Sequence, residues 1–283
     1  MPIKDNYLFY RAEPEDTAGP IAQAAHKMSL DPSVGHIPIP QTYAEALASP
    51  HAEQWQAAID SEAQSLTDHS TFRGIVKLPQ GAKTLGCRWV FKVKYRPVEG
   101  PDGQTRLEIE RFKARLTCKG FRQRPGIDFI ETFAPVIRTD ILRLLLSLVV
   151  ELDDMEIHQM DVRTAFLEPH LKEEIYLKTP PGIKIDTPFV KLLRTLYGLK
   201  QAPREFHDLM QSHLIANGYT KVPSCNCLYF KRVDGQLCLI GIYVDDCIIA
   251  GPSQLIAEAK QTLLARFDMQ DLGELKYVLG FEV

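Results

Sequence analysis

The sequence predicts a mixed α+β domain in which a small antiparallel sheet packs against helices. Two patterns predict it: apolar and charged residues alternate on both sides of a Pro-Asp-Gly turn, and helix-period segments separate short strand-like runs. The composition, 45% hydrophobic and 24% charged residues over 283 positions, is typical of a globular chain with a well-filled core. No apolar run approaches the ~20 residues of a membrane-spanning helix. We also find no secretory signal at the N-terminus.

The N-terminal part divides at about residue 40. Six prolines and no sustained periodicity in residues 1–40 predict a linker or tail. A helix is predicted to begin after Thr42, with Glu45 completing a capping box, and helical periodicity resumes after Pro50 through Trp55, Ile59 and Leu66. We therefore expect the folded domain to occupy residues 41–283.

A β-hairpin with a cationic face is predicted next. Residues 88–96 and 111–119 alternate between apolar and basic side chains around the turn at 101–103. Twelve Lys or Arg against four acids make the local net charge +8 between Lys83 and Arg124, while the whole chain carries −3. Cations that face one another on paired strands repel. The basic face therefore indicates phosphate binding, with an ordinary solvated face as the alternative.

The remaining elements follow in order. The predicted segments are an apolar core helix at 141–150 with Thr139 as N-cap, a strand at 157–162, a helix at 202–217 ended by Gly218, strands at 227–232 and 237–250 joined by Asp234-Gly235, and a helix at 254–267. The six cysteines lie mostly among apolar residues and are expected to be reduced thiols, which indicates an intracellular protein.

Three carboxylates stand in otherwise apolar strand runs. Asp245 and Asp246 are adjacent, and no Lys or Arg occurs from 237 to 259. Two such charges repel by roughly 4 kcal/mol at an effective dielectric of about 20, so the pair indicates either a bound cation or a turn open to water. Asp161 ends a second apolar strand. Carboxylates from two strand ends suit magnesium, and paired ions about 3.5–4 Å apart serve phosphoryl transfer.

These stretches resemble the reverse transcriptases of copia-type LTR retrotransposons. The two carboxylate motifs are Gln159-Met-Asp-Val-Arg-Thr-Ala-Phe-Leu167 and Tyr243-Val-Asp-Asp246. Further matching stretches, in order, are Lys113-Ala-Arg-Leu-Thr-Cys-Lys-Gly-Phe121, Glu131-Thr-Phe-Ala-Pro-Val136, Leu196-Tyr-Gly-Leu-Lys-Gln-Ala-Pro-Arg204, Asp271-Leu-Gly273 and Leu279-Gly-Phe-Glu-Val283. The resemblance implies a polymerase palm-and-fingers fold, with fingers at about 70–135 and palm at about 136–283. Since the family continues beyond the position of Val283, we expect the thumb to be largely missing.

The resemblance also implies roles for individual residues. Asp161, Asp245 and Asp246, with the Val162 carbonyl, would hold two Mg²⁺ ions, with Mn²⁺ as an alternative. The implied dNTP-binding residues are Lys113, Arg115, Phe166, Tyr197 and Gly198, of which Phe166 would act as a steric gate against a ribose 2′-hydroxyl. The cations Lys92, Lys94, Arg111 and Lys119, together with Gln201, are expected to contact nucleic acid.

The implied reaction is RNA-directed DNA synthesis, in which a primer 3′-hydroxyl attacks the α-phosphate of a dNTP. The expected partners are an RNA or DNA template with its primer and dNTPs, and no membrane. The family implies a cytoplasmic virus-like particle with a nuclear phase. Glu168-Pro169 replaces the Asn-Gly that is usual in the family, so one alternative is an inactive retrotransposon relic that folds without extending primers. A second alternative is a metal-dependent nuclease that uses the same carboxylates.

Overall fold

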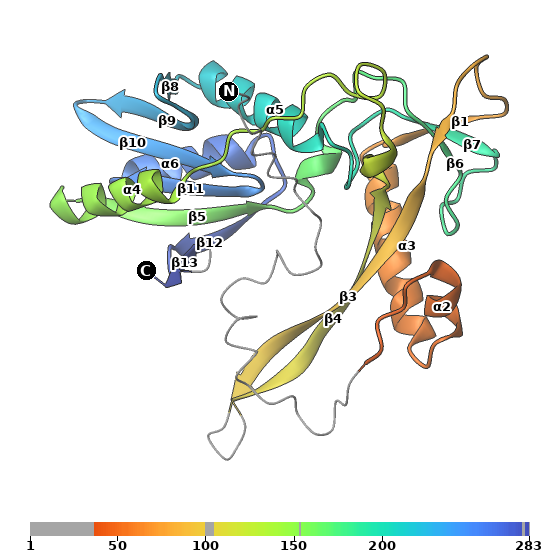
Figure 1. Ribbon diagram of the computed structural model, residues 1–283. Coiled ribbons are helices and arrows are strands. Elements are labelled where there is room, and N and C mark those ends of the chain that lie inside the picture. Colours follow the sequence, from red (N-terminus) through yellow and green to blue (C-terminus); the bar gives the residue numbers. More distant parts are fainter. Residues whose placement is uncertain (1–36, 100–104, 153, 279–280, 283) are drawn as a thin grey trace, which may run out of the picture. The chain divides into compact units, whose positions relative to one another are not determined.

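The computed structural model describes residues 37–99, 105–152, 154–278 and 281–282 (Figure 1). Contacts divide the chain into a larger unit, Ile39–Lys92 with Phe112–Leu275, and a smaller unit that includes Val93–Arg111 and Lys276–Val283. The mixture of helices and mainly antiparallel strands confirms the predicted α+β class. None of the helices in the described ranges is long and apolar enough to cross a membrane. Most of the predicted tail at 1–40, and the turn at 101–103, lie outside the described residues.

A six-stranded antiparallel sheet forms the centre of the larger unit. Its strand order is β12-β5-β11-β10-β9-β8. The strands are β5 (Glu156–Val162), β8 (Thr220–Val222), β9 (Cys225–Val233), β10 (Gln236–Tyr243), β11 (Asp246–Gly251) and β12 (Met269–Glu274). Because β5 pairs with β11, two strands that are distant in sequence lie side by side at the sheet centre.

Helices pack on both faces of this sheet (Figure 1). The main core joins sheet residues such as Met160, Ile240 and Ile249 to α5 (Ala202–Ala216) and α6 (Ser253–Leu264). The opposite face meets α4 (Thr139–Glu151): a Cβ at Gly241 would lie 2.6 Å from Ile137 Cδ1 and 3.7 Å from Leu145 Cδ1, so a larger residue there would require the Ile137 side chain to shift.

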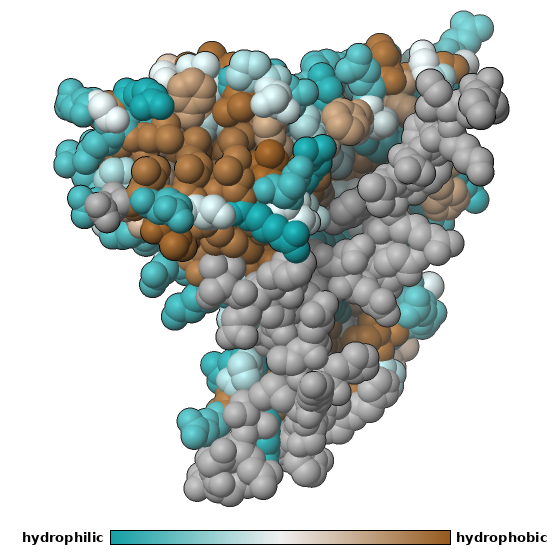
Figure 2. Space-filling model, turned by 60° about the vertical axis from the view of Figure 1, so that its left-hand side comes forward, coloured by the Kyte–Doolittle hydropathy of each residue, from teal (hydrophilic) through white to brown (hydrophobic). Residues whose placement is uncertain are grey.

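The predicted core helix at 141–150 is covered on one side only. Leu142 and Leu145 of α4 are buried, whereas Leu144 and Val150 are 50% and 84% exposed. The space-filling view shows apolar side chains gathered over the part of the chain that carries the six-stranded sheet (Figure 2). Thr139 is the first residue of α4, and the N-cap is Arg138, so the predicted cap is wrong by one position.

A second layer of the larger unit contains α2 (Tyr43–Ala48), α3 (Ala52–Asp68) and a four-stranded sheet of order β1-β7-β6-β2. These strands are β1 (Phe72–Ile75), β2 (Thr84–Leu85), β6 (Tyr176–Lys178) and β7 (Phe189–Leu192). The capping box is confirmed, because Thr42 Oγ1 accepts the Glu45 N–H at 3.2 Å and the Gln41 N–H donates to Glu45 Oε2 at 2.9 Å. The four-stranded sheet was not predicted, since its strands are too short for a periodic signal.

The predicted hairpin is confirmed as β3 (Cys87–Glu99) paired with β4 (Thr105–Cys118). Within the larger unit its apolar face packs on α3: the Trp55 ring lies edge-on to Phe91, with 5.2 Å between ring centroids, and to Phe112, with 4.6 Å. Aromatic pairs in this geometry stabilise a core beyond their buried area. The base of the hairpin is thereby fixed to the helix. Two short strands, β13 (Tyr277–Val278) and β14 (Phe281–Glu282), form a separate pair in the smaller unit.

The predicted single strand at 237–250 is wrong. The structure has two strands, β10 and β11, joined by a tight turn at Val244-Asp245. Val244 has φ +54°, which is unusual for a β-branched residue. The apolar run concealed this turn because it has no Gly, Pro or Asn where the chain reverses. The predicted Asp234-Gly235 turn is confirmed, with φ of +49° and +84°.

Candidate active site

The structure brings the three sequence-predicted carboxylates to one end of the six-stranded sheet. Asp161 on β5 is the direct register partner of Asp246 on β11. The Val162 N–H donates to the Asp245 carbonyl at 2.9 Å, which ties the β10–β11 turn to the end of β5. A strained residue, Val244, precedes the pair, and strain of this kind concentrates at functional turns.

Burial and mutual repulsion disfavour negative charge at this position. The pKa of Asp246 is raised to about 7. Burial is the largest cause, the charges of Asp245 and Asp161 add to it, and the hydrogen bond from Gln159 Nε2 at 2.9 Å opposes it. Burial also raises the pKa of Asp245, while its own backbone N–H, Arg115 and Lys113 lower it. The carboxylates therefore lie where a cation would be favoured.

The donor chemistry of these residues fits magnesium, which prefers carboxylate and carbonyl oxygens. Among the residues that the structure describes, no group of three or more His, Cys, Asp or Glu side chains is arranged to hold a metal ion. The pairing of the strands thus makes the carboxylates neighbours, but their side chains are not arranged as a complete set of metal ligands.

Three of the predicted dNTP-binding residues form a stack beside the carboxylates. The Arg115 guanidinium carbon lies 4.4 Å from the centroid of the Tyr197 ring, and that ring meets Phe166 edge-on at 5.4 Å. Burial raises the pKa of Tyr197 to about 12; Arg115 lowers it, while the charges of Glu62, Asp245 and Asp161 raise it. The hydroxyl is therefore a neutral group within electrostatic reach of the carboxylates. Lys113 belongs to the same neighbourhood, since its charge lowers the pKa of Asp245.

Gly198 is required by the crossing of two backbone segments. Its φ is +84°, and a Cβ there would lie 2.3 Å from the Cys118 carbonyl oxygen. Gly120 is just as constrained, since a Cβ on it would lie 2.0 Å from the Gly198 carbonyl oxygen. The Cys118 N–H donates to the Tyr197 carbonyl at 2.7 Å. This contact holds Tyr197 against the end of β4, from which Arg115 extends.

Gln201 is buried and bonded within the protein. It accepts a hydrogen bond from Gln123 Nε2 at 2.9 Å, and its own Nε2 donates to the Asp128 carbonyl at 2.9 Å and to Glu173 Oε2 at 3.1 Å. The structure therefore gives Gln201 the role of joining three loops. Of the other predicted nucleic-acid contacts, Lys92 and Lys119 belong to the larger unit, and Lys94 and Arg111 to the smaller one.

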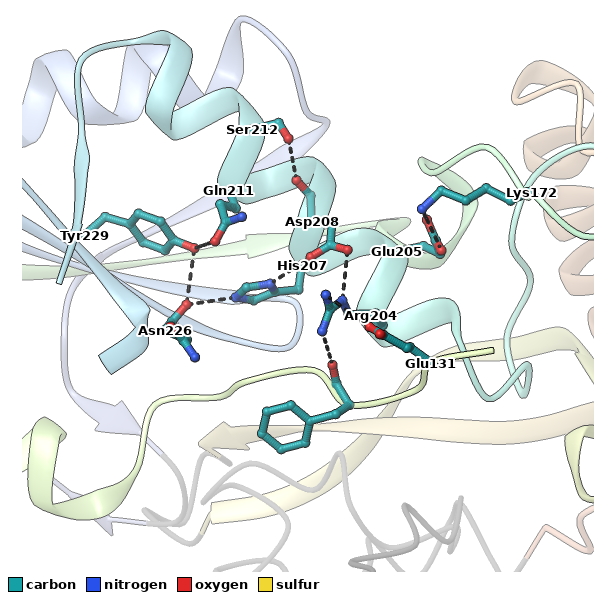
Figure 3. A network of polar contacts seen from close by, with 11 residues as sticks. Glu131, Lys172, Arg204, Glu205, His207, Asp208, Gln211, Ser212, Asn226 and Tyr229 are labelled. Carbon is teal, nitrogen blue, oxygen red and sulfur yellow. Dashed lines mark hydrogen bonds and ion pairs between the residues drawn. The ribbon is translucent and has the colours of Figure 1, made fainter. Parts of the chain in front are cut away.

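Arg204 at the start of α5 holds a second predicted motif in place (Figure 3). Its Nη1 donates to the Phe133 carbonyl at 3.1 Å, its Nη2 lies 3.4 Å from Glu131, and its Nε donates to Asp208 at 2.8 Å. The segment 131–136 and the motif at 196–204, which are distant in sequence, are thereby joined. Each of the three guanidinium nitrogens contacts a different residue, so a single arginine links α5 to two residues of this segment.

The neighbouring His207 is a buried histidine in the same network (Figure 3). Its Nε2 lies 3.1 Å from the Asn226 carbonyl, and its Nδ1 is 3.6 Å from Asp208 Oδ1. Burial lowers the pKa of His207, although the Asn226 carbonyl and Asp208 oppose the shift. The folded protein therefore prefers the neutral imidazole, which donates from Nε2.

We expect His207 to destabilise the fold in acid. Because its pKa is lower in the folded than in the unfolded state, the unfolded state binds more protons below about pH 6.5 and stability falls there. The Tm of the unsubstituted protein should drop about 2–4 °C further between pH 7.5 and 5.5 than that of His207→Gln, which corresponds to ~1 kcal/mol. His170→Gln, at an exposed histidine, is the control and should keep the full drop. Equal pH dependence in all three proteins would contradict the assignment.

Sequence reasoning missed the contribution of α3 to this site. His69, directly after α3, places its Nε2 3.1 Å from Thr164 Oγ1 and 3.6 Å from Glu168 Oε1, on the segment that leads from Asp161 to Phe166 and beyond. Glu62 in the middle of α3 acts electrostatically on Tyr197. A signal for Glu62 was present, since it interrupts the apolar stripe of Trp55, Ile59 and Leu66.

Comparisons with known proteins agree with the motifs. A family model described as reverse transcriptase (RNA-dependent DNA polymerase) matches residues 69–283. The retrovirus-related Pol polyprotein from transposon TNT 1-94 of Nicotiana tabacum is 41% identical over 249 residues, which is 86% of this chain and 18% of that protein. The Pol polyproteins from transposons RE1 and RE2 of Arabidopsis thaliana are 35% and 32% identical over 90% and 93% of the chain.

The chain spans less than a fifth of the length of each of these relatives, 17–18%. The family match covers the whole stretch from the end of α3 through both carboxylate motifs. The resemblance to copia-type elements is thereby confirmed at the level of the family. This chain belongs to the reverse transcriptase (RNA-dependent DNA polymerase) family and is a reverse transcriptase domain of the LTR retrotransposon type.

Proposed function

We propose that this chain is an RNA-directed DNA polymerase that joins dNTPs to a primer 3′-hydroxyl. The observation that carries the proposal is the pairing of β5 with β11, which sets Asp161 opposite Asp246 and ties Asp245 to Val162. Phe166, Tyr197 and Arg115 are stacked beside that point. In this proposal the six-stranded sheet forms a palm, and the base of the β3–β4 hairpin forms part of the fingers.

Each residue has a defined task in the proposed reaction. Asp161, Asp245 and Asp246, with the Val162 carbonyl, would hold two Mg²⁺ ions, which supply charge stabilisation to the transferred phosphoryl group. Lys113 and Arg115 would neutralise the incoming triphosphate. Phe166 would pack under the sugar, and Tyr197 would hold both Phe166 and Arg115 in place.

The proposed partners follow from the same chemistry. A template–primer would lie across the carboxylates. Lys92, Lys94, Arg111 and Lys119 remain proposed contacts to nucleic acid, while Gln201 would act through the loops it joins. Exposed Phe121 lies next to exposed Arg122, whose guanidinium carbon is 5.8 Å from the Phe121 ring centroid, a pair that suits stacking on unpaired bases and contact with phosphates. A cytoplasmic particle with a nuclear phase belongs to this proposal as the setting of the reaction.

A primer-extension assay tests the proposal directly. With a poly(rA) template, an oligo(dT) primer, dTTP and Mg²⁺, we expect extension products that disappear when EDTA removes the metal and return when Mg²⁺ is added in excess. Failure to extend under any divalent ion would favour the inactive relic. Metal-dependent cleavage of a labelled duplex in the absence of dNTPs would favour the nuclease instead.

A further inference from the structure

Glu62 is a carboxylate in the buried stripe of α3. The stripe is formed by Trp55, Ile59 and Leu66, each at most 1% exposed. Glu62 follows Ile59 by three residues and precedes Leu66 by four, so it lies on the same face of the helix. An ionised group is costly to bury without partners. Its presence in an apolar stripe therefore needs a structural reason.

The partner of Glu62 is the backbone of β4. Glu62 Oε1 accepts a hydrogen bond from the Leu116 N–H at 3.2 Å, and the Leu116 side chain is fully buried. Burial raises the pKa of Glu62, whereas the Leu116 N–H, and then the charges of Arg115, Lys113 and His69, lower it. The carboxylate thus lies among the same cations that would meet a triphosphate.

Leu116 directly follows Arg115 in β4, and Lys113 lies two residues before Arg115. The contact from α3 therefore fixes the backbone from which both side chains extend. On the other side, Arg115 lies over Tyr197, whose backbone carbonyl accepts the Cys118 N–H. The last residues of β4 are held from two directions, by Glu62 and by the loop that carries Tyr197.

We propose that Glu62 is a positioning residue for nucleotide binding: by accepting the Leu116 N–H from α3, it holds the end of β4 so that Lys113 and Arg115 face the triphosphate. The inference rests on the proposed polymerase function and adds to it a residue from outside the matched motifs. Glu62 acts through β4 and does not touch the substrate. Its hydrogen-bond acceptor, rather than its charge, is the feature that matters.

This inference makes a specific kinetic prediction. Glu62→Ala leaves the Leu116 N–H without its acceptor and releases the end of β4, and a displacement of about 1 Å in a positioning group can cost up to about 100-fold. We expect the KM for dTTP to rise about 10-fold while kcat stays within about twofold. Glu62→Gln keeps an acceptor oxygen without the charge, and its KM should stay within about twofold of the unsubstituted value.

Asp60→Ala is the matched control, because Asp60 is an exposed acid on the same helix. It should change neither constant. A residue with a purely structural role would lower the fraction of folded enzyme, so the apparent kcat would fall with KM unchanged. Either that result for Glu62→Ala, or a KM for Glu62→Gln as high as that of Glu62→Ala, would overturn the proposal.

A binding measurement separates this inference from the proposed function. The rise in Tm on adding dTTP, Mg²⁺ and template–primer, above that with template–primer alone, reports triphosphate binding without turnover. If the unsubstituted protein shows the rise but does not extend primers, the polymerase proposal fails, and loss of the rise in Glu62→Ala with recovery in Glu62→Gln supports the inference. If the protein extends primers and all variants share one KM, only the inference fails. If the unsubstituted protein shows neither the rise in Tm nor primer extension, both the polymerase proposal and the inference about Glu62 fail.

Discussion

Replacing Asp245 with asparagine is expected to lower kcat for primer extension by about 1,000-fold or more, equivalent to ~4 kcal/mol of transition-state stabilisation. Asparagine has the same shape and keeps the backbone contact of residue 245 with Val162. It removes the anionic oxygen that would hold a divalent ion and neutralise its charge. Asp161→Asn should have an equally large effect, because Asp161 approaches the same point from β5.

Loss of activity in Asp245→Asn should come with unchanged or higher stability. The pKa of Asp245 is raised by burial, so the unfolded state binds fewer protons than the folded state above the usual aspartate range, and stability falls as pH rises through that interval. At pH 8 without divalent ions the full penalty is present. Asp245→Asn removes it, so we expect a Tm at or above that of the unsubstituted protein.

Single-nucleotide incorporation under saturating dTTP checks the predicted loss of kcat. The Tm measured in EDTA checks the predicted stability. Asp271→Asn is the matched control: Asp271 lies on β12 of the same sheet, is exposed, and pairs with Lys260 at 2.8 Å. The Lys260 side chain of this pair is only 13% exposed, so the variant should lower Tm somewhat while it keeps near-normal activity. Extension by Asp245→Asn at the unsubstituted rate would refute the assignment of the carboxylates.

Local features of the fold could be read from the sequence because their signals are local. The capping box at Thr42 and Glu45 needs only four adjacent residues, and the hairpin of β3 and β4 follows from alternation on both sides of one turn. The Asp234-Gly235 turn follows from residues that tolerate positive φ. In each case the physical cause lies within the segment that shows the pattern.

The active-site geometry depends on pairing between segments that are distant in sequence. That Asp161 is the register partner of Asp246 is decided by how β5 and β11 align, and no local pattern fixes that alignment. The motif resemblance predicted the meeting of the carboxylates, whereas periodicity predicted one strand where the chain turns at Val244-Asp245. The adjacent aspartates allowed a turn only as one alternative, because no Gly, Pro or Asn marks the point where the chain reverses.

The four-stranded sheet and the role of Glu62 could not be predicted from the sequence, for two different reasons. Strands such as β2 and β6 have two and three residues, which is too few for periodicity to be recognised. Glu62 did carry a signal, a charge within an apolar stripe, but its meaning depends on the Leu116 N–H of β4 reaching the helix. A charge within an apolar stripe can be recognised in sequence, whereas its partner is found only in the folded chain.

Substituting Phe166 with valine is expected to reduce discrimination against ribonucleotides by about 100-fold or more. Phe166 lies in a short 3-10 segment, Ala165–Leu167, and its backbone carbonyl accepts the Thr195 hydroxyl. Edge contact with Tyr197 holds its ring. A fixed ring under the sugar would exclude a 2′-hydroxyl by overlap, and a smaller side chain leaves room for it. A ring that is held by packed neighbours discriminates well between deoxyribose and ribose, because it cannot move aside without disturbing those neighbours.

The measurement is the ratio of kcat/KM for dTTP to that for UTP on one template–primer. Because both substrates are used by the same enzyme preparation, the fraction of folded protein cancels in the ratio. Phe166→Tyr keeps the ring and should retain discrimination within a few-fold, whereas Phe166→Val should lose it mainly through a lower KM for UTP. Unchanged discrimination in Phe166→Val would mean that the sugar does not pack on this ring. In that case the stack of Arg115, Tyr197 and Phe166 would serve the triphosphate alone.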